Sequence, residues 1–225
     1  MKKSPLFALL ITLISTSAFA QDEALVKSSK SIWLKFSGQR DCQVGYCADG
    51  IPARPLKLAL DYYESNKNVI ENDSYIGIID YSKPSTEKRF WILNLSNGSS
   101  VSMHVTHGKN SEGQLAMAEK FSNVVGSEMS SLGFYVTDRE TYVGKYGDSL
   151  RLTGLSSTNS KARERAIVIH SADYASSWFI ENKGRLGLSQ GCPAVSKQNI
   201  GVVLKRMKGR TLLLGYHPSW EEIKK

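Results

Sequence analysis

One cysteine in the sequence has the setting of a reactive thiol. Of three cysteines, Cys42 and Cys47 lie five residues apart in a polar, glycine-containing segment and can close a small disulfide loop, which leaves Cys192 unpaired. Cys192 lies in a glycine-rich loop, residues 184–193, that ends in a proline, and loops of this kind lie at the surface and often hold functional groups. We therefore expect Cys192 to be a reactive thiol; a buried, inert cysteine is the alternative.

A histidine upstream is the candidate base for this thiol. Residues 165–169 (RAIVI) form an apolar run typical of a buried strand, and His170 ends that run, where it can face a cleft. A thiol attacks as the thiolate, and a neighbouring imidazole can take its proton. Gly191, directly before Cys192, leaves room for backbone N–H groups to point at a developing oxyanion. By spacing alone, a structural histidine and an unrelated cysteine are an equally good interpretation.

The elements that must position these residues are mostly short strands. Segments rich in Ile, Val and aromatic residues recur between clusters of Pro, Ser, Asn and Gly, and Asn97-Gly98 is a strong hairpin signal between two of them. The predicted strands are 75–81, 89–95, 99–106, 132–137, 150–155, 165–170 and 211–216, and the predicted helices are 55–66 and 196–207. The sequence therefore predicts a mainly β fold, an antiparallel sandwich or barrel with a few peripheral helices.

Two stretches around the candidate thiol and imidazole resemble a family of bacterial cell-wall enzymes. Residues 165–174 (RAIVIHSADY) and 184–195 (GRLGLSQGCPAV) are similar to the L,D-transpeptidase catalytic domain (YkuD-type) family, in its murein L,D-transpeptidase branch. The resemblance covers about residues 56–216 and implies the β fold of that catalytic domain. Further matching segments are 79–85 (IDYSKPS), 106–108 (THG), 121–123 (FSN), 130–135 (SSLGFY) and 147–152 (GDSLRL).

The resemblance assigns roles to the residues around the thiol. It makes Cys192 the nucleophile and His170 the base. The third element of the family's site is the backbone carbonyl after the histidine, which falls on Ser171 here. Gly191 and Cys192 are expected to supply the oxyanion-hole N–H groups.

The chain departs from the family's pattern at two places. Gln190 stands where the family usually has a histidine. Pro193-Ala194 stand where a hydrophobic residue followed by Asn or Arg is usual, which removes a polar group from the substrate side. We take Arg185 as the candidate replacement that binds a substrate carboxylate.

Ser189 and His107 complete the candidate substrate-binding set. Ser189 is the serine of a G-x-S-x-G motif, residues 187–191, but no buried strand precedes it and the order of acid and histidine downstream is wrong for a serine hydrolase. We expect this serine to shape the cysteine loop. His107 is expected to line the cleft, with a hydrogen-bonded loop histidine as the alternative. A zinc site shared with His104 is disfavoured, because residues three apart on a strand point to opposite faces.

The implied reaction is acyl transfer in two steps. The cysteine attacks a peptidoglycan tetrapeptide stem, expels D-Ala and leaves a thioester, which the amine of a neighbouring stem resolves into a cross-link. With water as the acceptor the same enzyme is an L,D-carboxypeptidase. The alternative without enzymatic activity is a module that binds murein and does not alter it. Neither acyl-transfer route needs a cofactor or a metal.

Composition and the N-terminus predict an exported protein. At 225 residues, 41% hydrophobic and 22% charged, the chain is ordinary for a globular protein, which excludes disorder, collagen and coiled coil. Residues 1–20 have a charged start, a short apolar run and an A-x-A site, the pattern of a secretory signal peptide. Its removal lowers the net charge from +8 to +6, because it contains two lysines and no acids. A basic surface suits an acidic wall polymer and, in an exported protein, makes nucleic acid an improbable partner.

The predicted organisation follows from these segments. After the signal peptide we expect a lead segment, 21–52, with the candidate Cys42–Cys47 disulfide, then one catalytic domain, 53–217, and a tail, 218–225. We expect no membrane span after signal removal, and a location in the periplasm or at the cell wall.

Overall fold

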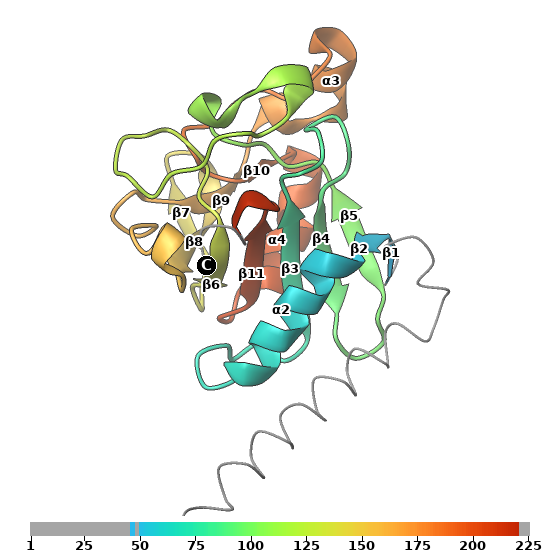
Figure 1. Ribbon diagram of the computed structural model, residues 1–225, viewed down its shortest axis with the longest axis vertical. Coiled ribbons are helices and arrows are strands. Elements are labelled where there is room, and N and C mark those ends of the chain that lie inside the picture. The colour runs from blue at the N-terminus through green and yellow to red at the C-terminus, as the bar shows by residue number, and fades with distance from the viewer. Residues whose placement is uncertain (1–45, 48–49, 221–225) are drawn as a thin grey trace, which may run out of the picture.

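One mixed sheet of nine strands forms the framework of the computed structural model, which describes residues 46–47 and 50–220 (Figure 1). Eight of its strands follow the order β10-β9-β8-β6-β11-β3-β4-β5, and β7 pairs with β8. A separate two-stranded ladder joins β1 to β2. The strands are β1 (Tyr46–Cys47), β2 (Ile51–Pro52), β3 (Tyr75–Asp80), β4 (Phe90–Asn94), β5 (Ser100–Met103), β6 (Gly133–Thr137), β7 (Tyr142–Gly144), β8 (Gly147–Gly154), β9 (Val168–Ser171), β10 (Ala194–Val195) and β11 (Leu212–Tyr216).

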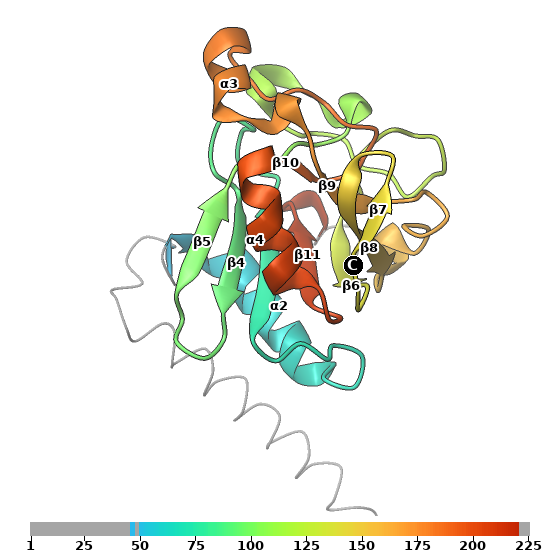
Figure 2. The same ribbon diagram turned by 180° about the vertical axis from the view of Figure 1, so that it is seen from behind.

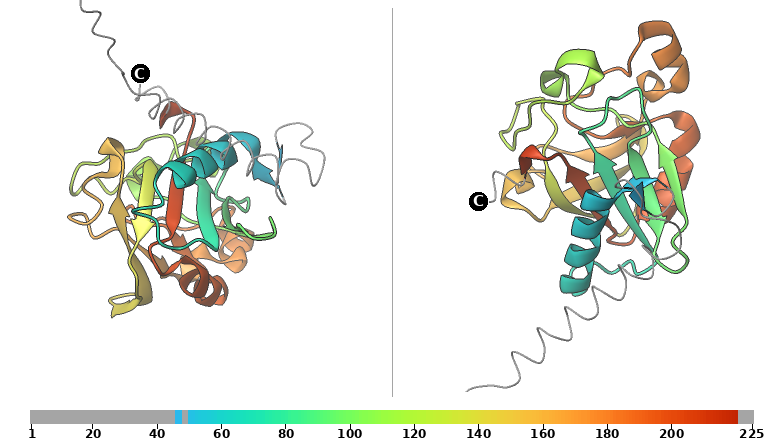
Figure 3. Two further views of the ribbon diagram at one scale, coloured as in Figure 1. Left: turned by 90° about the horizontal axis from the view of Figure 1, so that it is seen from below. Right: turned by 45° about the vertical axis from the view of Figure 1, so that its right-hand side comes forward.

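Two helices cover the centre of the sheet from opposite sides (Figures 2 and 3). Helix α2 (Ala53–Ser65) buries apolar residues spaced three and four apart, which is the pattern of one helix face, against β3 and β11. Helix α4 (Lys197–Met207) buries Val203 and Met207 on the other side. Both were predicted, and α2 begins two residues early because Pro55 lies in its first turn, where proline costs no helical hydrogen bond.

The prediction of a mainly β fold with peripheral helices is confirmed, and the sheet contains two parallel pairs among its antiparallel ones. Strand β11 runs parallel to β3, and β10 runs parallel to β9. All five residues of β11 are buried, because the strand lies in the middle of the sheet with a neighbour on each side. A continuous apolar run of this kind is typical of a central strand.

Several elements near the candidate site differ from their predicted bounds. Strand β9 begins at Val168 rather than at residue 165, because residues 161–166 form turns that bring Ala166 to φ +52°. Three elements near the site were not predicted, namely β7, β10 and helix α3 (Ser177–Lys183), and neither were β1 and β2. The helix has local signals, since Ser176 caps its N-terminus through the Phe179 N–H and Gly184 ends it at φ +72°. Short 3-10 turns lie at Lys109–Ser111, Gln114–Ala116, Ser157–Asn159 and Asp173–Ala175.

Some expectations fall outside the described residues. These are the signal peptide, most of the lead segment, the end of the tail and the Cys42–Cys47 disulfide, since Cys47 is described only as part of β1. Within residues 50–220, none of the helices is long and apolar enough to cross a membrane. The same residues contain no group of three His, Cys, Asp or Glu side chains arranged to hold a metal ion.

Candidate active site

The loop that carries Cys192 is shaped by Ser189. The Ser189 hydroxyl donates to the Cys192 carbonyl at 2.6 Å and accepts from the Gly191 N–H at 3.1 Å. The backbone of Ser189 is bonded in turn to the His107 carbonyl and the Lys109 N–H, at 3.0 and 2.8 Å. Ser189 is only 4% exposed, so its side chain lies inside the loop. Its hydroxyl supplies hydrogen bonds that the backbone of a tight turn lacks, as expected for a residue that shapes the loop.

Gly191 has a conformation that requires glycine. Its φ is +111°, and a Cβ at this position would lie 2.6 Å from the Met129 carbonyl oxygen. The N–H of Gly191 points to the Ser189 hydroxyl, so it is not open to an oxyanion in this conformation. Of the two N–H groups predicted for the oxyanion hole, the one on Cys192 has no hydrogen-bond partner among the described residues.

The Cys192 thiol lies against the first residues of β9. Its sulfur accepts from the Val168 N–H at 3.5 Å and donates to the Ala166 carbonyl at 3.8 Å. Burial raises the pKa of the Cys192 thiol, while the Val168 N–H and the charge of Arg165 lower it in part. The resting group is therefore a protonated thiol at neutral pH.

Arg165 is the cation beside this thiol, and sequence reasoning did not assign it a role. Its guanidinium donates to the Ser122 carbonyl at 2.7 Å, to the Ser131 hydroxyl at 3.1 Å and to the Met129 carbonyl. These bonds tie the segment behind Gly191 to the start of β9. The only sequence signal was a cation directly before an apolar strand.

His170 lies in β9 with one ring nitrogen occupied. Its Nδ1–H donates to the Ser171 carbonyl at 3.0 Å, the contact that the resemblance predicted. Because a carbonyl can only accept, Nδ1 carries the proton and Nε2 keeps its lone pair in the neutral ring. Burial lowers the pKa of His170 below its usual 6.5, and the Ser171 bond raises it in part. The Tyr146 ring, from the tip of the β7–β8 hairpin, stacks on the imidazole at 4.4 Å.

The strand register brings the thiol and the imidazole to neighbouring strands. Ala194 of β10 pairs with His170 of β9, so Cys192 precedes that pair by two residues and lies beside Val168. Two residues along a strand correspond to about 6.6 Å. The thiol's hydrogen-bond partners among the described residues are main-chain groups of β9 and the turn before it, and the imidazole is not one of them. Direct proton transfer therefore requires a contact between the sulfur and the imidazole that this conformation does not show.

His107 fits the alternative interpretation, a hydrogen-bonded histidine beside the cysteine loop. The side chain is fully buried: its Nδ1 accepts from Arg89 at 2.7 Å, and its Nε2–H donates to Glu112 at 2.5 Å. Burial, together with the nearby positive charges of Arg89 and Arg185, lowers the pKa of His107 to about 3. The position of His107 follows from Arg89, which directly precedes β4 and is fully buried. The Arg89 guanidinium needs hydrogen-bond acceptors inside the protein, and the His107 Nδ1 is one of them.

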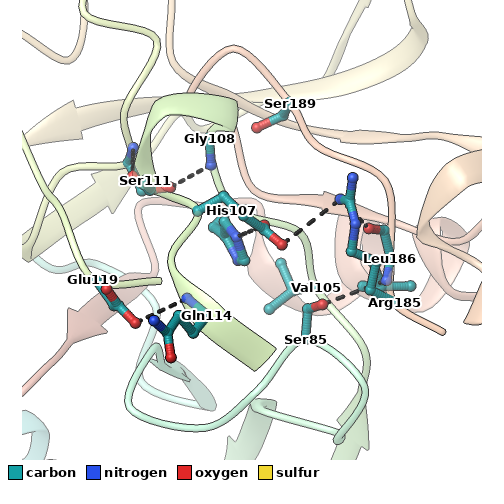
Figure 4. A network of polar contacts seen from close by, with 12 residues as sticks. Ser85, Val105, His107, Gly108, Ser111, Gln114, Glu119, Arg185, Leu186 and Ser189 are labelled. Atoms are coloured by element: carbon teal, nitrogen blue, oxygen red, sulfur yellow. Dashed lines mark hydrogen bonds and ion pairs between the residues drawn. The ribbon is translucent and has the colours of Figure 1, made fainter. Parts of the chain in front are cut away.

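Arg185 lies at the exposed edge of this group, and its side chain is 42% exposed (Figure 4). Its guanidinium lies 3.8 Å from Glu112 and donates to the Leu186 carbonyl at 3.1 Å. The predicted carboxylate binder is thus already beside a carboxylate of the protein. His104 is apart from this group and bonds the Thr86 carbonyl at 3.1 Å.

One family model matches most of the chain. The model of the L,D-transpeptidase catalytic domain matches residues 48–216. Solved structures similar to this chain include an L,D-transpeptidase from Mycobacterium smegmatis (12% identity, TM-score 0.39, covering 64% of this chain and 59% of that one) and Mycobacterium tuberculosis L,D-transpeptidase 1 (14% identity, TM-score 0.35, covering 63% and 60%). The chain thus spans about three fifths of the length of these structures. The search of curated proteins gave no match.

Proposed function

The chain belongs to the L,D-transpeptidase catalytic domain family, and on this premise we propose that it is a cysteine-dependent L,D-transpeptidase acting on peptidoglycan stem peptides. The observation that carries the proposal is the arrangement around β9. A free thiol, that of Cys192, lies beside the start of this strand, and the His170 imidazole, whose Nε2 has no hydrogen-bond partner among the described residues, lies farther along it. This is the pair of groups that acyl transfer through a thioester requires.

In the first step the enzyme is acylated. The Cys192 proton passes to His170 Nε2 as the sulfur attacks the carbonyl carbon of the bond before the terminal D-Ala. The Cys192 N–H, which has no partner among the described residues, donates to the developing oxyanion. The carbon–nitrogen bond breaks, the proton on His170 goes to the leaving amine, and D-Ala departs from a thioester on Cys192.

In the second step an acceptor releases the acyl group. The amine of a neighbouring stem loses a proton to His170 Nε2 as it attacks the thioester. The carbon–sulfur bond then breaks, and the proton on His170 passes to the departing sulfur, which restores the thiol and the neutral imidazole. The product is a cross-link between two stems. Water in place of the amine makes the product a shortened stem, which is the carboxypeptidase outcome.

The pKa shifts favour a neutral thiol on Cys192 and a neutral imidazole on His170 in the resting enzyme. The raised pKa of the thiol and the lowered pKa of His170 both disfavour a standing thiolate–imidazolium ion pair. The Ser171 carbonyl supports the imidazole when it becomes positively charged, because it accepts from Nδ1–H in either state. We propose that the thiolate forms together with attack, once substrate excludes water.

The proposed substrate also fits an exported protein with a basic surface. Peptidoglycan lies outside the cytoplasmic membrane, in agreement with the predicted signal peptide and a periplasmic or wall-associated location. The steps above use only side chains and backbone groups of this chain. A murein-binding module without catalysis is the competing proposal.

Product analysis by mass spectrometry tests the proposal. Wild-type protein and Cys192→Ala are incubated with disaccharide-tetrapeptides of two stem chemistries, one with diaminopimelate and one with lysine. We expect wild type to give cross-linked dimer with at least one of them, and a transient mass increase on the protein equal to the acyl group. Cys192→Ala should give neither. Unchanged substrate with both stems, or products from Cys192→Ala, would contradict the proposal.

A further inference from the structure

The partly buried Arg165 is held by neutral oxygen atoms. Its guanidinium donates to the Ser122 carbonyl at 2.7 Å, to the Ser131 hydroxyl at 3.1 Å, to the Ser127 hydroxyl at 3.4 Å and to the Met129 carbonyl. Among the described residues it forms no ion pair with a carboxylate. A positive charge kept partly inside a protein without a counter-ion is costly, and burial accordingly lowers the pKa of Arg165. The charge is therefore available to an anion that forms nearby.

The guanidinium packs against the residue that precedes the nucleophile. A Cβ on Gly191 would lie 3.0 Å from Nη2 of Arg165 and 2.6 Å from the Met129 carbonyl oxygen, which is the oxygen that accepts from Nη2. The main chain of the same arginine is also near, because the next residue, Ala166, accepts from the Cys192 thiol at 3.8 Å. Arg165 thus approaches the cysteine loop through its side chain and through its neighbour in the chain.

Cys192 is the group near this charge that can become an anion. Two ionisable groups interact with the charge of Arg165, namely the Tyr135 phenol and the Cys192 thiol. Burial raises the pKa of Tyr135 well above its usual 10, so this side chain stays a neutral phenol. Burial also raises the pKa of the thiol, and Arg165 acts against that effect by favouring the thiolate. Among the described residues, the charge of Arg165 therefore gains a partner of opposite sign when the thiol loses its proton.

The other titratable groups around the thiol are neutral at pH 7. Tyr81 and Tyr174 interact with the charge of the thiolate, and burial raises the pKa of both, that of Tyr174 to about 12. The His170 imidazole, farther along β9, is neutral because burial lowers its pKa. Within the described part of the chain, Arg165 is therefore the permanent charge that acts on the sulfur.

We propose that Arg165 is a positioning residue for the nucleophile, which holds the Met129 carbonyl against Gly191 and supplies a fixed counter-charge to the Cys192 thiolate. This inference rests on the proposed function. As the thiol proton passes to His170, negative charge develops on the sulfur, and a cation already in place stabilises that charge without reorganisation. The thioester is neutral, so the same cation also favours the departure of the thiolate in the second step.

Two substitutions separate the charge of Arg165 from its hydrogen bonds. Arg165→Lys keeps the charge and loses the planar set of donors, whereas Arg165→Gln keeps an N–H donor for the Met129 carbonyl and loses the charge. The matched controls are Arg163→Lys and Arg163→Gln. Arg163 lies in the same turn, but its guanidinium donates to both carboxylate oxygens of Asp138 at 2.9 Å. Circular dichroism confirms folding, and Arg165→Met is the uncharged replacement if the glutamine variant does not fold.

Alkylation of the thiol by iodoacetamide measures the counter-charge without any substrate. The rate is followed on the Cys192 peptide by mass spectrometry, across neutral and alkaline pH. We expect Arg165→Gln to be alkylated about three- to tenfold more slowly than wild type at pH 7, with its profile displaced to higher pH, because less thiolate is present. Arg165→Lys and both Arg163 variants should stay within about twofold of wild type.

Steady-state cross-linking gives an independent measurement. In Arg165→Gln, kcat on the tetrapeptide donor should fall about tenfold while KM stays within about threefold of wild type, since the residue acts on the sulfur and not on the bound stem. Arg165→Lys should restore most of kcat.

The two measurements distinguish failure of this inference from failure of the proposed function. Slower alkylation of Arg165→Gln, but not of Arg165→Lys, supports the role of Arg165 even if wild type forms no cross-link. Identical alkylation profiles in wild type and Arg165→Gln would overturn the inference, whatever the cross-linking activity. Equal slowing in Arg165→Gln and Arg165→Lys would also overturn it, because the charge would then have no effect of its own.

Discussion

Two buried histidines, His170 and His107, lie close to the same cysteine loop and differ in what their second nitrogen contacts. Each has a pKa lowered chiefly by burial. His107 is bonded on both sides, to Arg89 and to Glu112. His170 has one side-chain hydrogen bond among the described residues, from Nδ1–H to the Ser171 carbonyl, and the half-exposed Tyr146 ring stacks on its imidazole.

The difference separates a histidine that holds structure from one that can exchange protons. A ring with both nitrogens occupied can accept a proton only by breaking a bond inside the protein. A ring whose Nδ1–H is fixed by a carbonyl presents Nε2 as a base of defined direction. Burial alone, and a shifted pKa alone, therefore do not identify the catalytic residue of this pair.

The largest expected effect comes from making the same substitution at both histidines. We predict that His170→Gln lowers kcat/KM for cross-linking by about 10³-fold, the usual contribution of a general base, whereas His107→Gln lowers it by less than about tenfold. Steady-state kinetics on the tetrapeptide donor measure both. Similar losses in two folded variants would remove the distinction drawn here.

Stability is expected to respond in the opposite order. His107→Gln leaves the buried Arg89 and Glu112 groups poorly paired, so we predict a loss of about 2–4 kcal/mol in the free energy of unfolding at pH 7. His170→Gln should lose less than about 1.5 kcal/mol, since a single hydrogen bond to Ser171 is removed. Urea unfolding of the two variants and wild type gives these values.

The loss of stability in His107→Gln should depend on pH. With a pKa of about 3 in the folded state and 6.5 when unfolded, His107 binds fewer protons folded than unfolded between these values. Its contribution to the free energy of unfolding is therefore fully present above pH 6.5. As the pH is lowered from 6.5 to about 3, this contribution decreases by about 1.4 kcal/mol per pH unit. Consequently, the destabilisation by His107→Gln should shrink by about 2–3 kcal/mol between pH 7 and 4.5. A penalty that is constant with pH would contradict the buried neutral His107.

The smallest expected effect concerns the ring over His170. Tyr146→Ala removes the stacked phenol, which should lower kcat/KM by about three- to tenfold. Because water then reaches the imidazole, the pKa of His170 should move up toward 6.5, and the acid limb of the pH–rate profile with it. Val143→Ala, at an 81%-exposed position of the same hairpin, is the matched control. An unchanged acid limb in Tyr146→Ala would show that the ring does not contribute to the dehydration of His170.

Local pattern was sufficient for most of the elements. The strands β3, β4, β6 and β11 were predicted within one or two residues, because apolar runs between turn residues are local signals. The two-residue β10 and the three-residue β7 were missed, since elements this short carry no periodicity. Both turned out to matter, as β10 sets the register of Cys192 against His170 and β7 supplies the hairpin that ends in Tyr146.

The sequence by itself determined that a free thiol follows glycine in a tight loop, and that a histidine ends an apolar strand. Only the tertiary structure decided which charged residues accompany them. Arg89 meets His107 across 18 residues, and Arg151 meets Val168 across 17, because those contacts depend on which strands pair and in what register. Strand register is a property of the whole sheet, whereas composition and spacing report only on neighbours along the chain. That is why Arg165, the cation beside the thiol, became visible only once the strands were in place.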